Sequence, residues 1–375
     1  MSFIEYEILL AAGTVNPDKD QQAHLCKLLS EEFDQDRLIR LAKKEGMTGL
    51  LYKSLKKAGI LGFFGHLQMQ QLQSSYYRTV QCNLQIVYDL KAILRRSNEK
   101  GVQVVLLQGI ALLQKIYKDI GLRPLTDIDL WVLPEKRGVF DTLMTQLGYQ
   151  RDPLYPNTFK KGMTIVDINS HILWADRIRS RRHLLAKSQR VLYDNIKILN
   201  FEGEPAGGLD DLDQVLYLSL HAFKHCAGRL VWLVDIKHLI TGWQASNWKA
   251  LFDRAGELGQ VSIICYMLYL MRHLFNLKPP ADIQATVAGR SLAWLERVTL
   301  QKRLNGRPLP DWAPLLLLAS GKSLMTRVYF VFETLFPRPP VLRQIFCGKP
   351  DFKTWQLYLK RALQLFRMVK SSKST

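Results

Sequence analysis

Two aspartates separated by one residue are the strongest candidates for chemistry in this sequence. Asp127 and Asp129 lie in the stretch Thr126-Asp-Ile-Asp-Leu-Trp-Val132, which is otherwise mostly apolar. Side chains on a strand alternate between faces, so both carboxylates are expected on one face. Carboxylates held close together repel each other unless a cation lies between them, and their oxygens suit Mg²⁺ or Mn²⁺. The pair predicts a metal site, although such a pair alone is also typical of a capped turn beside a solvated acid.

A third carboxylate, Asp167, follows in the apolar stretch Met163-Thr-Ile-Val-Asp-Ile168. Three carboxylates from two neighbouring strands can hold two metal ions about 3.5–4 Å apart. One ion would activate an attacking hydroxyl and the other would stabilise a leaving pyrophosphate. The combination is more specific than any one of its members.

Two residues upstream of the pair could bind phosphate. Gly109 stands between a predicted strand and a predicted helix, where glycine lets a phosphate approach the backbone N–H groups of the helix start. A tight strand-to-helix turn would need a glycine for steric reasons alone. Arg123 carries a guanidinium that matches phosphate oxygens. It is equally consistent with a loop arginine paired with a surface acid.

The elements that would position these residues alternate between two kinds of pattern. Short β-branched runs predict buried strands, and apolar residues recurring every three or four positions predict helices. In chain order we expect a strand at 102–107, a helix at 110–120, a strand at 127–133, a helix at 135–147 and a strand at 163–168. This order describes a small α/β unit with a mixed sheet.

Helical patterns flank this unit on both sides. Residues 20–95 show helical spacing with a turn at 59–65, and helical spacing resumes beyond 209. We therefore predict an α+β chain with an N-terminal helical region at 1–95, a catalytic unit at 96–205 and a C-terminal helical region at 206–375.

Several motifs resemble the uncharacterised bacterial nucleotidyltransferases of the DNA polymerase β superfamily. The strongest are Leu107-Gln-Gly-Ile-Ala-Leu-Leu113 and Gly121-Leu-Arg-Pro-Leu-Thr-Asp-Ile-Asp-Leu-Trp-Val132. Val166-Asp-Ile-Asn-Ser-His171 and Leu220-His-Ala-Phe-Lys-His225 look like further motifs of that family. The resemblance implies a polymerase β-like fold. It also implies transfer of a nucleoside monophosphate from an NTP to an acceptor, with release of pyrophosphate.

The resemblance also implies roles for the candidate residues. Asp127 and Asp129 would bind Mg²⁺ or Mn²⁺, and Asp167 would complete the site and help to deprotonate the acceptor. Gly109 would lie against the triphosphate, preceded by Gln108 where the family often has lysine. The superfamily's Gly-Ser pair is also replaced here by glycine and isoleucine, so a catalytically degenerate binding module is the alternative. A glycosyltransferase with an Asp-x-Asp motif is a further one, but no nucleotide-binding half precedes the motif.

Three histidines are candidates for an acceptor pocket. His221 and His225 are four residues apart on a predicted helix, a spacing that can bind zinc. No third ligand is evident, so we expect them to line an acceptor pocket or to pack between helices. His171 is similarly expected either in that pocket or as a hydrogen-bonded structural residue.

The charge balance points to anionic partners. Fifty-two Lys and Arg against 33 Asp and Glu give a formal charge of +19, which attracts nucleotides, RNA and anionic lipids. The basic run at 177–190 is also consistent with a solvated face. The acceptor stays open among RNA, protein, a small molecule and a lipid-linked sugar.

The same sequence predicts a reduced, cytoplasmic protein without a transmembrane segment. The five cysteines are scattered, and the N-terminus carries acids where an export signal would be basic. The longest apolar run, 261–271, is shorter than the roughly 20 residues that a membrane span needs.

The C-terminal stretch reads as a basic amphipathic helix. Its apolar stripe consists of Trp355, Leu359, Ala362, Phe366 and Val369. Such a helix can lie on an anionic membrane or bind RNA, but more often the stripe packs on its own domain, as we expect here.

Overall fold

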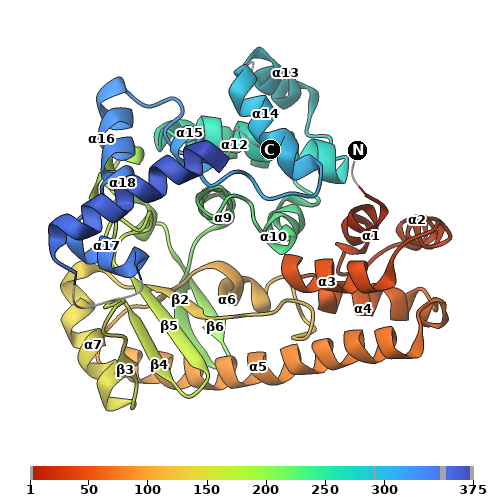
Figure 1. Ribbon diagram of the computed structural model, residues 1–375. Helices are drawn as coiled ribbons and strands as arrows, with labels where there is room; N and C mark the ends of the chain where they lie inside the picture. The colour runs from red at the N-terminus through yellow and green to blue at the C-terminus, as the bar shows by residue number, and fades with distance from the viewer. Residues whose placement is uncertain (1–2, 291, 347–351, 372–375) are drawn as a thin grey trace.

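The computed structural model of the protein describes residues 3–290, 292–346 and 352–371. It is an α+β structure in which a mixed seven-stranded sheet lies between two helical regions (Figure 1). The predicted fold class is therefore confirmed. The elements before the sheet are α1 (Ile4–Ala12), α2 (Lys19–Leu29), α3 (Gln35–Glu45), α4 (Thr48–Lys57), η1 (Leu61–Phe63) and α5 (His66–Glu99).

Local sequence signals set the ends of these N-terminal helices. The side chains of Asp18 and Gln21 each accept a hydrogen bond from the other's backbone N–H, which starts α2. Gly46 ends α3 with a φ of 72°, a conformation that favours glycine. The predicted turn at 59–65 separates α4 from α5. The long helix α5 then runs under α3, α4 and the sheet (Figure 1).

The sheet has the strand order β3-β4-β5-β2-β1-β7-β6. Strand β1 is antiparallel to β2 and parallel to β7, and β2 is parallel to β5. The strands are β1 (Val105–Leu106), β2 (Ile128–Trp131), β3 (Gln150–Arg151), β4 (Thr158–Lys161), β5 (Thr164–Asn169), β6 (Lys197–Phe201) and β7 (Glu204–Gly208). The three predicted strands correspond to β1, β2 and β5, whereas the other four were not predicted.

The helix predicted at 110–120 is wrong in its second half. Helix α6 spans only Gln108–Leu113, and irregular turns follow it. The carboxylate of Asp119 accepts hydrogen bonds from Lys53 Nζ and from Tyr76 Oη, both at 2.7 Å. These contacts hold the segment against α4 and α5, so tertiary contacts override its helical spacing. The helix predicted at 135–147 is present as η2 (Pro134–Lys136) and α7 (Arg137–Gln146).

The remaining elements are helical. They are η3 (Arg179–Leu184), α8 (Arg190–Tyr193), α9 (Asp211–Lys224), α10 (Leu230–Ile240), α11 (Ala245–Glu257), α12 (Val261–Phe275), α13 (Ala281–Gly289), α14 (Trp294–Leu304), α15 (Ala313–Leu317), α16 (Leu324–Leu335), α17 (Pro339–Ile345) and α18 (Thr354–Ser371). Of these, η3 and α8 lie within the predicted catalytic unit and were not predicted, whereas the helices beyond residue 209 agree with the prediction. Helices α9 and α10 lie on the side of the sheet opposite α5 (Figure 1). Among the described helices, none is long and apolar enough to cross a membrane. The domain boundaries at 95 and 205 stay predictions, and α5 continues past the first of them.

Candidate active site

The structure brings the three predicted carboxylates to one face of the sheet. Asp129 in β2 lies directly opposite Asp167 in β5 in the parallel register. Asp127 immediately precedes β2, so strand alternation places it on the same face as Asp129. Leu130 and Ile168 point to the opposite face, where they are buried.

Burial and mutual repulsion define the electrostatics of this face. Asp129 is only 8% exposed. Its burial raises the pKa of its carboxyl well above the ordinary value, and the charges of Asp127 and Asp167 raise it further. Burial also raises the pKa of Asp167, although a hydrogen bond from the Thr158 hydroxyl acts in the opposite direction. Ionisation of all three carboxyl groups on this face would therefore require a compensating positive charge.

Lys224, the last residue of α9, lies near these acids. Its Nζ is 3.6 Å from the centroid of the Trp174 ring. Burial lowers the pKa of Lys224 well below its usual value, and repulsion from Arg181 lowers it further. Asp129 and Asp167 act in the opposite direction by favouring the charged form. The charge of Lys224 is thus influenced both by the carboxylates and by Arg181 and Arg177.

Two arginines from the basic run at 177–190 complete this cation cluster, which consists of Arg177, Arg181 and Lys224. Burial lowers the pKa of Arg181 to about 10, and Arg177 contributes to the shift, whereas Glu333 opposes it. Within the described residues, the buried Nε of Arg181 has no hydrogen-bond partner. Crowded cations with unused donors are suited to binding a polyanion such as a triphosphate.

Gly109 and Arg123 lie in a buried network. A Cβ atom at position 109 would be 2.4 Å from Arg123 Nη1, so glycine is needed for the guanidinium to fit. Arg123 Nη2 is 2.9 Å from one oxygen of Asp235, and the Tyr117 hydroxyl donates to the other at 2.6 Å. The structure therefore places Arg123 in an interior ion pair, and it packs Gly109 against that side chain.

Two non-glycine residues with a left-handed backbone contact the same tyrosine of α9. Gln108 and Trp174 have φ values of 54° and 59°, in the left-handed region that non-glycine residues rarely adopt. Both contact Tyr217 of α9. Gln108 Nε2 is 3.4 Å from the Tyr217 hydroxyl, and the centroid of the Trp174 ring is 5.6 Å from the centroid of the Tyr217 ring. Burial and the charge of Asp129 raise the pKa of Tyr217. Strain of this kind is concentrated at functional sites.

His221 and His225 belong to an aromatic cluster. Their ring centroids are 4.7 Å apart, and the ring of Trp232 lies 5.0 Å from that of His221. Within the described part of the chain, neither nitrogen of the 5% exposed His221 has a hydrogen-bond partner. Desolvation and nearby cations such as Lys224 lower the pKa of His221 well below its usual value and that of His225 to about 3. Both imidazoles are therefore neutral at pH 7, and within the described residues no third His, Cys, Asp or Glu side chain is arranged with them to hold a metal ion.

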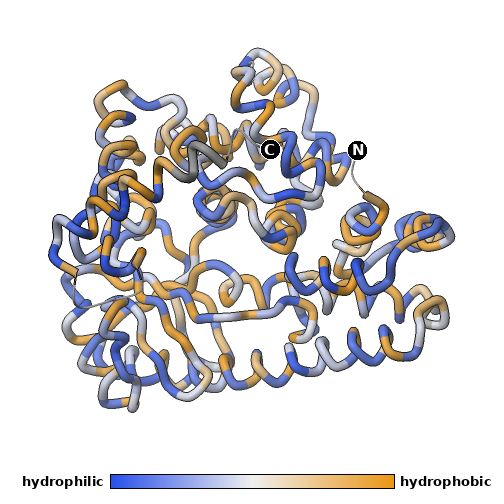
Figure 2. Tube along the Cα trace, viewed as in Figure 1, coloured by the Kyte–Doolittle hydropathy of each residue, from blue (hydrophilic) through white to orange (hydrophobic). Residues whose placement is uncertain are grey.

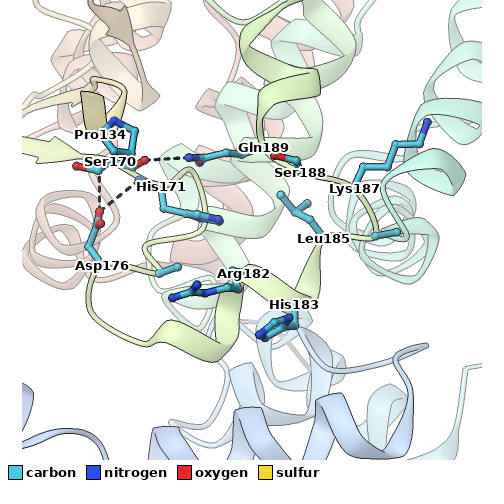
Figure 3. A pocket seen from close by; sticks show the side chains of 12 residues that line it. Pro134, Ser170, His171, Asp176, Arg182, His183, Leu185, Lys187, Ser188 and Gln189 are labelled. Carbon is cyan, nitrogen blue, oxygen red and sulfur yellow. Dashed lines mark hydrogen bonds between the residues drawn. The ribbon is translucent and has the colours of Figure 1, made fainter. Parts of the chain in front are cut away.

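His171 lies apart from the other two histidines, in a pocket beyond the end of β5. This pocket has a volume of about 540 Å³, and His171, Arg182, His183 and Gln189 are among its lining residues (Figure 3). Gln189 Nε2 donates to the backbone oxygen of Ser170 at 3.0 Å, which fixes one wall. Burial lowers the pKa of His171. The three predicted histidines thus occupy two separate environments.

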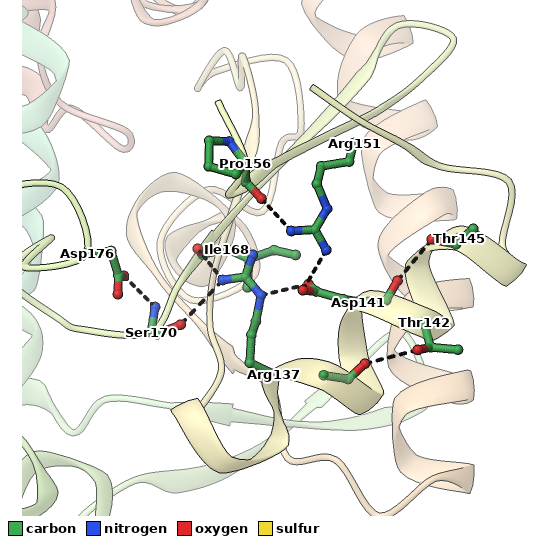
Figure 4. Close-up of polar contacts among 10 residues, drawn as sticks. Arg137, Asp141, Thr142, Thr145, Arg151, Pro156, Ile168, Ser170 and Asp176 are labelled. Atoms are coloured by element: carbon green, nitrogen blue, oxygen red, sulfur yellow. Dashed lines mark hydrogen bonds and ion pairs between the residues drawn. The ribbon is translucent and has the colours of Figure 1, made fainter. Parts of the chain in front are cut away.

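An arginine network holds the end of β5 in place. Arg137 Nη1 donates to the backbone oxygen of Ile168 at 3.2 Å and to the Ser170 hydroxyl at 3.3 Å (Figure 4). Its Nε pairs with Asp141 at 2.7 Å, and Arg151 pairs with the same carboxylate at 2.6 Å. The strand that carries Asp167 is therefore fixed just beyond that residue.

Residues 31–276 match the profile of a protein family described as uncharacterised nucleotidyltransferases. This chain belongs to that family. The matched range includes all seven strands, the three carboxylates and the cation cluster. No curated protein is significantly similar to the chain. Among solved structures, the chain is similar to the antibiotic-resistance factor ANT(2'')-Ia, with 14% identity and a TM-score of 0.35, over 52% of this chain and 100% of that one.

The family's general chemistry, nucleotidyl transfer, raises the question of whether these residues suit a divalent cation. Asp127, Asp129 and Asp167 supply the hard oxygen donors that Mg²⁺ or Mn²⁺ prefers, and their mutual repulsion calls for positive charge. Across the described ranges, however, no group of three or more His, Cys, Asp or Glu side chains is already arranged to hold a metal ion. The donor set fits such an ion by its chemistry, and no coordination geometry follows from it.

Sequence reasoning missed the cation cluster of this nucleotidyltransferase. Tyr217, His221 and Lys224 are spaced four and three residues apart, so the period of α9 places them on one helix face. That spacing was available as a signal for Lys224. Arg181 carries no comparable signal, because the packing of η3 on α16 decides which arginines of η3 face inward. Arg177 precedes η3, and no local pattern distinguishes it from the other arginines of the basic run.

Proposed function

We propose that this protein transfers a nucleoside monophosphate from an NTP to an acceptor hydroxyl and releases pyrophosphate. The observation that supports this proposal is the juxtaposition of the three carboxylates with the cation cluster of Arg177, Arg181 and Lys224. Carboxylates can hold a divalent cation, and the cation cluster offers charge to a triphosphate. Family membership supports nucleotidyl transfer in general.

Each residue group has a distinct proposed role. Asp127, Asp129 and Asp167 would hold Mg²⁺ or Mn²⁺, which would neutralise the phosphates and activate the acceptor hydroxyl. The acceptor oxygen bonds to the α-phosphorus while the bond from that phosphorus to the bridging oxygen breaks. Asp167 accepts the hydroxyl proton, and Lys224 and Arg181 stabilise the charge that develops on pyrophosphate.

The pocket beyond β5 is our candidate for acceptor binding. It begins three residues after Asp167, and Arg182, His171 and Gln189 give it a polar lining. Its volume of about 540 Å³ accommodates a small molecule or the end of a larger one. Gly109, Gln108 and Arg123 remain predicted phosphate-binding residues from the sequence, but their packing makes the cation cluster the stronger candidate for that role.

The test is an NTP assay with α-labelled nucleotides, either cation, and pooled cell extract as the acceptor source. Transfer of label and release of pyrophosphate are expected with the wild type and lost in Asp127→Asn and Asp129→Asn. The matched control is Asp253→Asn, because Asp253 is exposed on α11. Full activity of the Asp129→Asn variant would refute the proposal. NTP binding without pyrophosphate release, even with Mn²⁺, would instead support the binding module, and labelling from nucleotide sugars alone would support a glycosyltransferase.

A further inference from the structure

Positive charge and exposed apolar side chains coincide at the C-terminal end of the chain. Residues 322–375 contain eleven Lys and Arg against two Asp and Glu, a net of +9 out of the formal +19 of the whole chain. The same segment also holds a large share of the strongly exposed large hydrophobic side chains among the described residues. Neither property belongs to the candidate active site.

Helix α16 exposes one apolar face. Met325 is 78% exposed, and Leu324, Val328 and Phe332 are also largely exposed. Their spacing of three and four residues places Met325, Val328 and Phe332 on one side of the helix. The opposite side of α16 packs on η3, where Glu333 accepts hydrogen bonds from backbone N–H groups. The exposed face is therefore presented by a helix that is anchored from behind.

Helix α18 repeats this arrangement and corrects the expectation that its stripe packs on its own domain. Trp355 is 62% exposed, and Leu359, Leu363 and Phe366 are more than half exposed. The helix is held instead through buried Leu357 and through Arg361, which donates to the Leu335 and Thr334 backbone oxygens at the end of α16. The side chain of Val369 lies outside the described residues. Figure 2 shows hydrophobic and hydrophilic positions mixed along both helices.

We propose that the exposed faces of α16 and α18, the α16/α18 surface, dock onto an anionic lipid bilayer. A helix that combines aromatic and aliphatic side chains with flanking basic residues lies in the membrane interface, where the apolar face inserts and the basic residues meet anionic headgroups. Lys353 and Lys360 flank the stripe of α18. A second copy of this chain carries the same positive charge, which opposes its docking at this surface, whereas RNA would leave the apolar faces in water.

Docking in this way would also place the acceptor pocket near the bilayer. Glu333 of α16 accepts hydrogen bonds from the backbone N–H groups of Arg179 and Ser180, which lie three and two positions before the pocket residue Arg182. Arg338, just after α16, donates to the backbone oxygens of Asp176 and Arg177. The packed side of α16 and the residues just after it are thus joined by direct hydrogen bonds to the segment at residues 176–180, part of which lines the pocket.

The test is sedimentation of the full chain with vesicles. Wild-type protein is expected to bind vesicles of phosphatidylcholine mixed with phosphatidylglycerol, and to bind pure phosphatidylcholine vesicles much more weakly. The double variant Met325→Glu/Trp355→Glu should lose about tenfold or more in binding, because it removes apolar insertion and adds negative charge. The matched control is Tyr88→Glu, since Tyr88 is 72% exposed on α5, and it should bind like the wild type.

Three results would overturn the proposal. One is the absence of sedimentation with anionic vesicles at low salt, and another is undiminished binding of a double variant whose circular dichroism matches the wild type. The third is that the same substitutions abolish a dimer or an RNA complex of the protein but leave its vesicle binding unchanged. If the double variant does not fold, brominated lipids added to wild-type protein should quench tryptophan fluorescence. That quenching should decrease in Trp355→Phe, and equal quenching would contradict insertion.

Discussion

Replacement of Arg123 by methionine separates a structural role for this side chain from a phosphate-binding one. Arg123 and Asp235 are 8% and 0% exposed, and Nη2 lies 2.9 Å from the carboxylate. Removing one partner of a buried ion pair costs about 3–5 kcal/mol, because the other charge is left uncompensated. Tyr117 still donates to Asp235 in the variant, so we expect a loss near the lower limit, about 3 kcal/mol in the free energy of unfolding.

The measurement is urea unfolding followed by circular dichroism. The double variant Arg123→Met/Asp235→Leu removes both charges, and it should recover at least half of the lost stability. Arg190→Met is the matched control, because Arg190 forms exposed pairs with Glu135 and Asp194, and it should change the free energy by about 0–1 kcal/mol. An Arg123→Met protein with wild-type stability but without NTP binding would refute this reasoning and identify Arg123 as a phosphate ligand.

Three further substitutions follow from the site. Without a bound metal ion, folding raises the pKa of Asp129 above the value of about 3.9 that it has in the unfolded chain. The stability of the protein therefore falls as the pH rises from about 3.9 through the pKa of Asp129 in the folded protein. Asp129→Asn should therefore melt at a higher temperature than the wild type in a chelator at neutral pH, and a lower melting temperature would contradict the predicted repulsion. Gly109→Ala should displace Arg123 and lower the free energy of unfolding by about 1–3 kcal/mol in the same urea assay. An unchanged free energy of unfolding would show that the Arg123 side chain can move aside at little cost. Lys224→Ala should weaken binding of a non-hydrolysable NTP analogue in calorimetry by about tenfold or more, and exposed Lys249→Ala should not; equal affinities would remove Lys224 from the phosphate site.

The sequence was sufficient for the parts of the fold that local patterns determine. Alternation placed Asp127 and Asp129 on one face, and the β-branched run around Asp167 predicted the strand that pairs with β2. Helix α7 and the turn before α5 also follow from local spacing. These features depend on neighbours within a few residues of each other.

Features set by distant contacts were not predictable in this way. Strand β7 has the sequence Glu-Pro-Ala-Gly-Gly, which has little strand propensity. A Cβ at Gly207 would lie 3.0 Å from a Val105 side-chain carbon, so glycine is present because β1 approaches closely. The buried pairing of Arg123 with Asp235 joins residues more than a hundred positions apart. In such cases the residue type at a position is determined by a contact with a residue far away in the sequence, which the local pattern does not contain.

The length of α5 has a consequence for how the protein can be divided. Its 34 residues correspond to about 50 Å of continuous helix, and the N-terminal helices and the sheet both rest on it. A fragment that begins at residue 96 would lack nearly all of α5, and the strands that pack on this helix would be exposed to solvent. The N-terminal helices and the sheet should therefore unfold together in calorimetry as one cooperative unit, because both pack on α5.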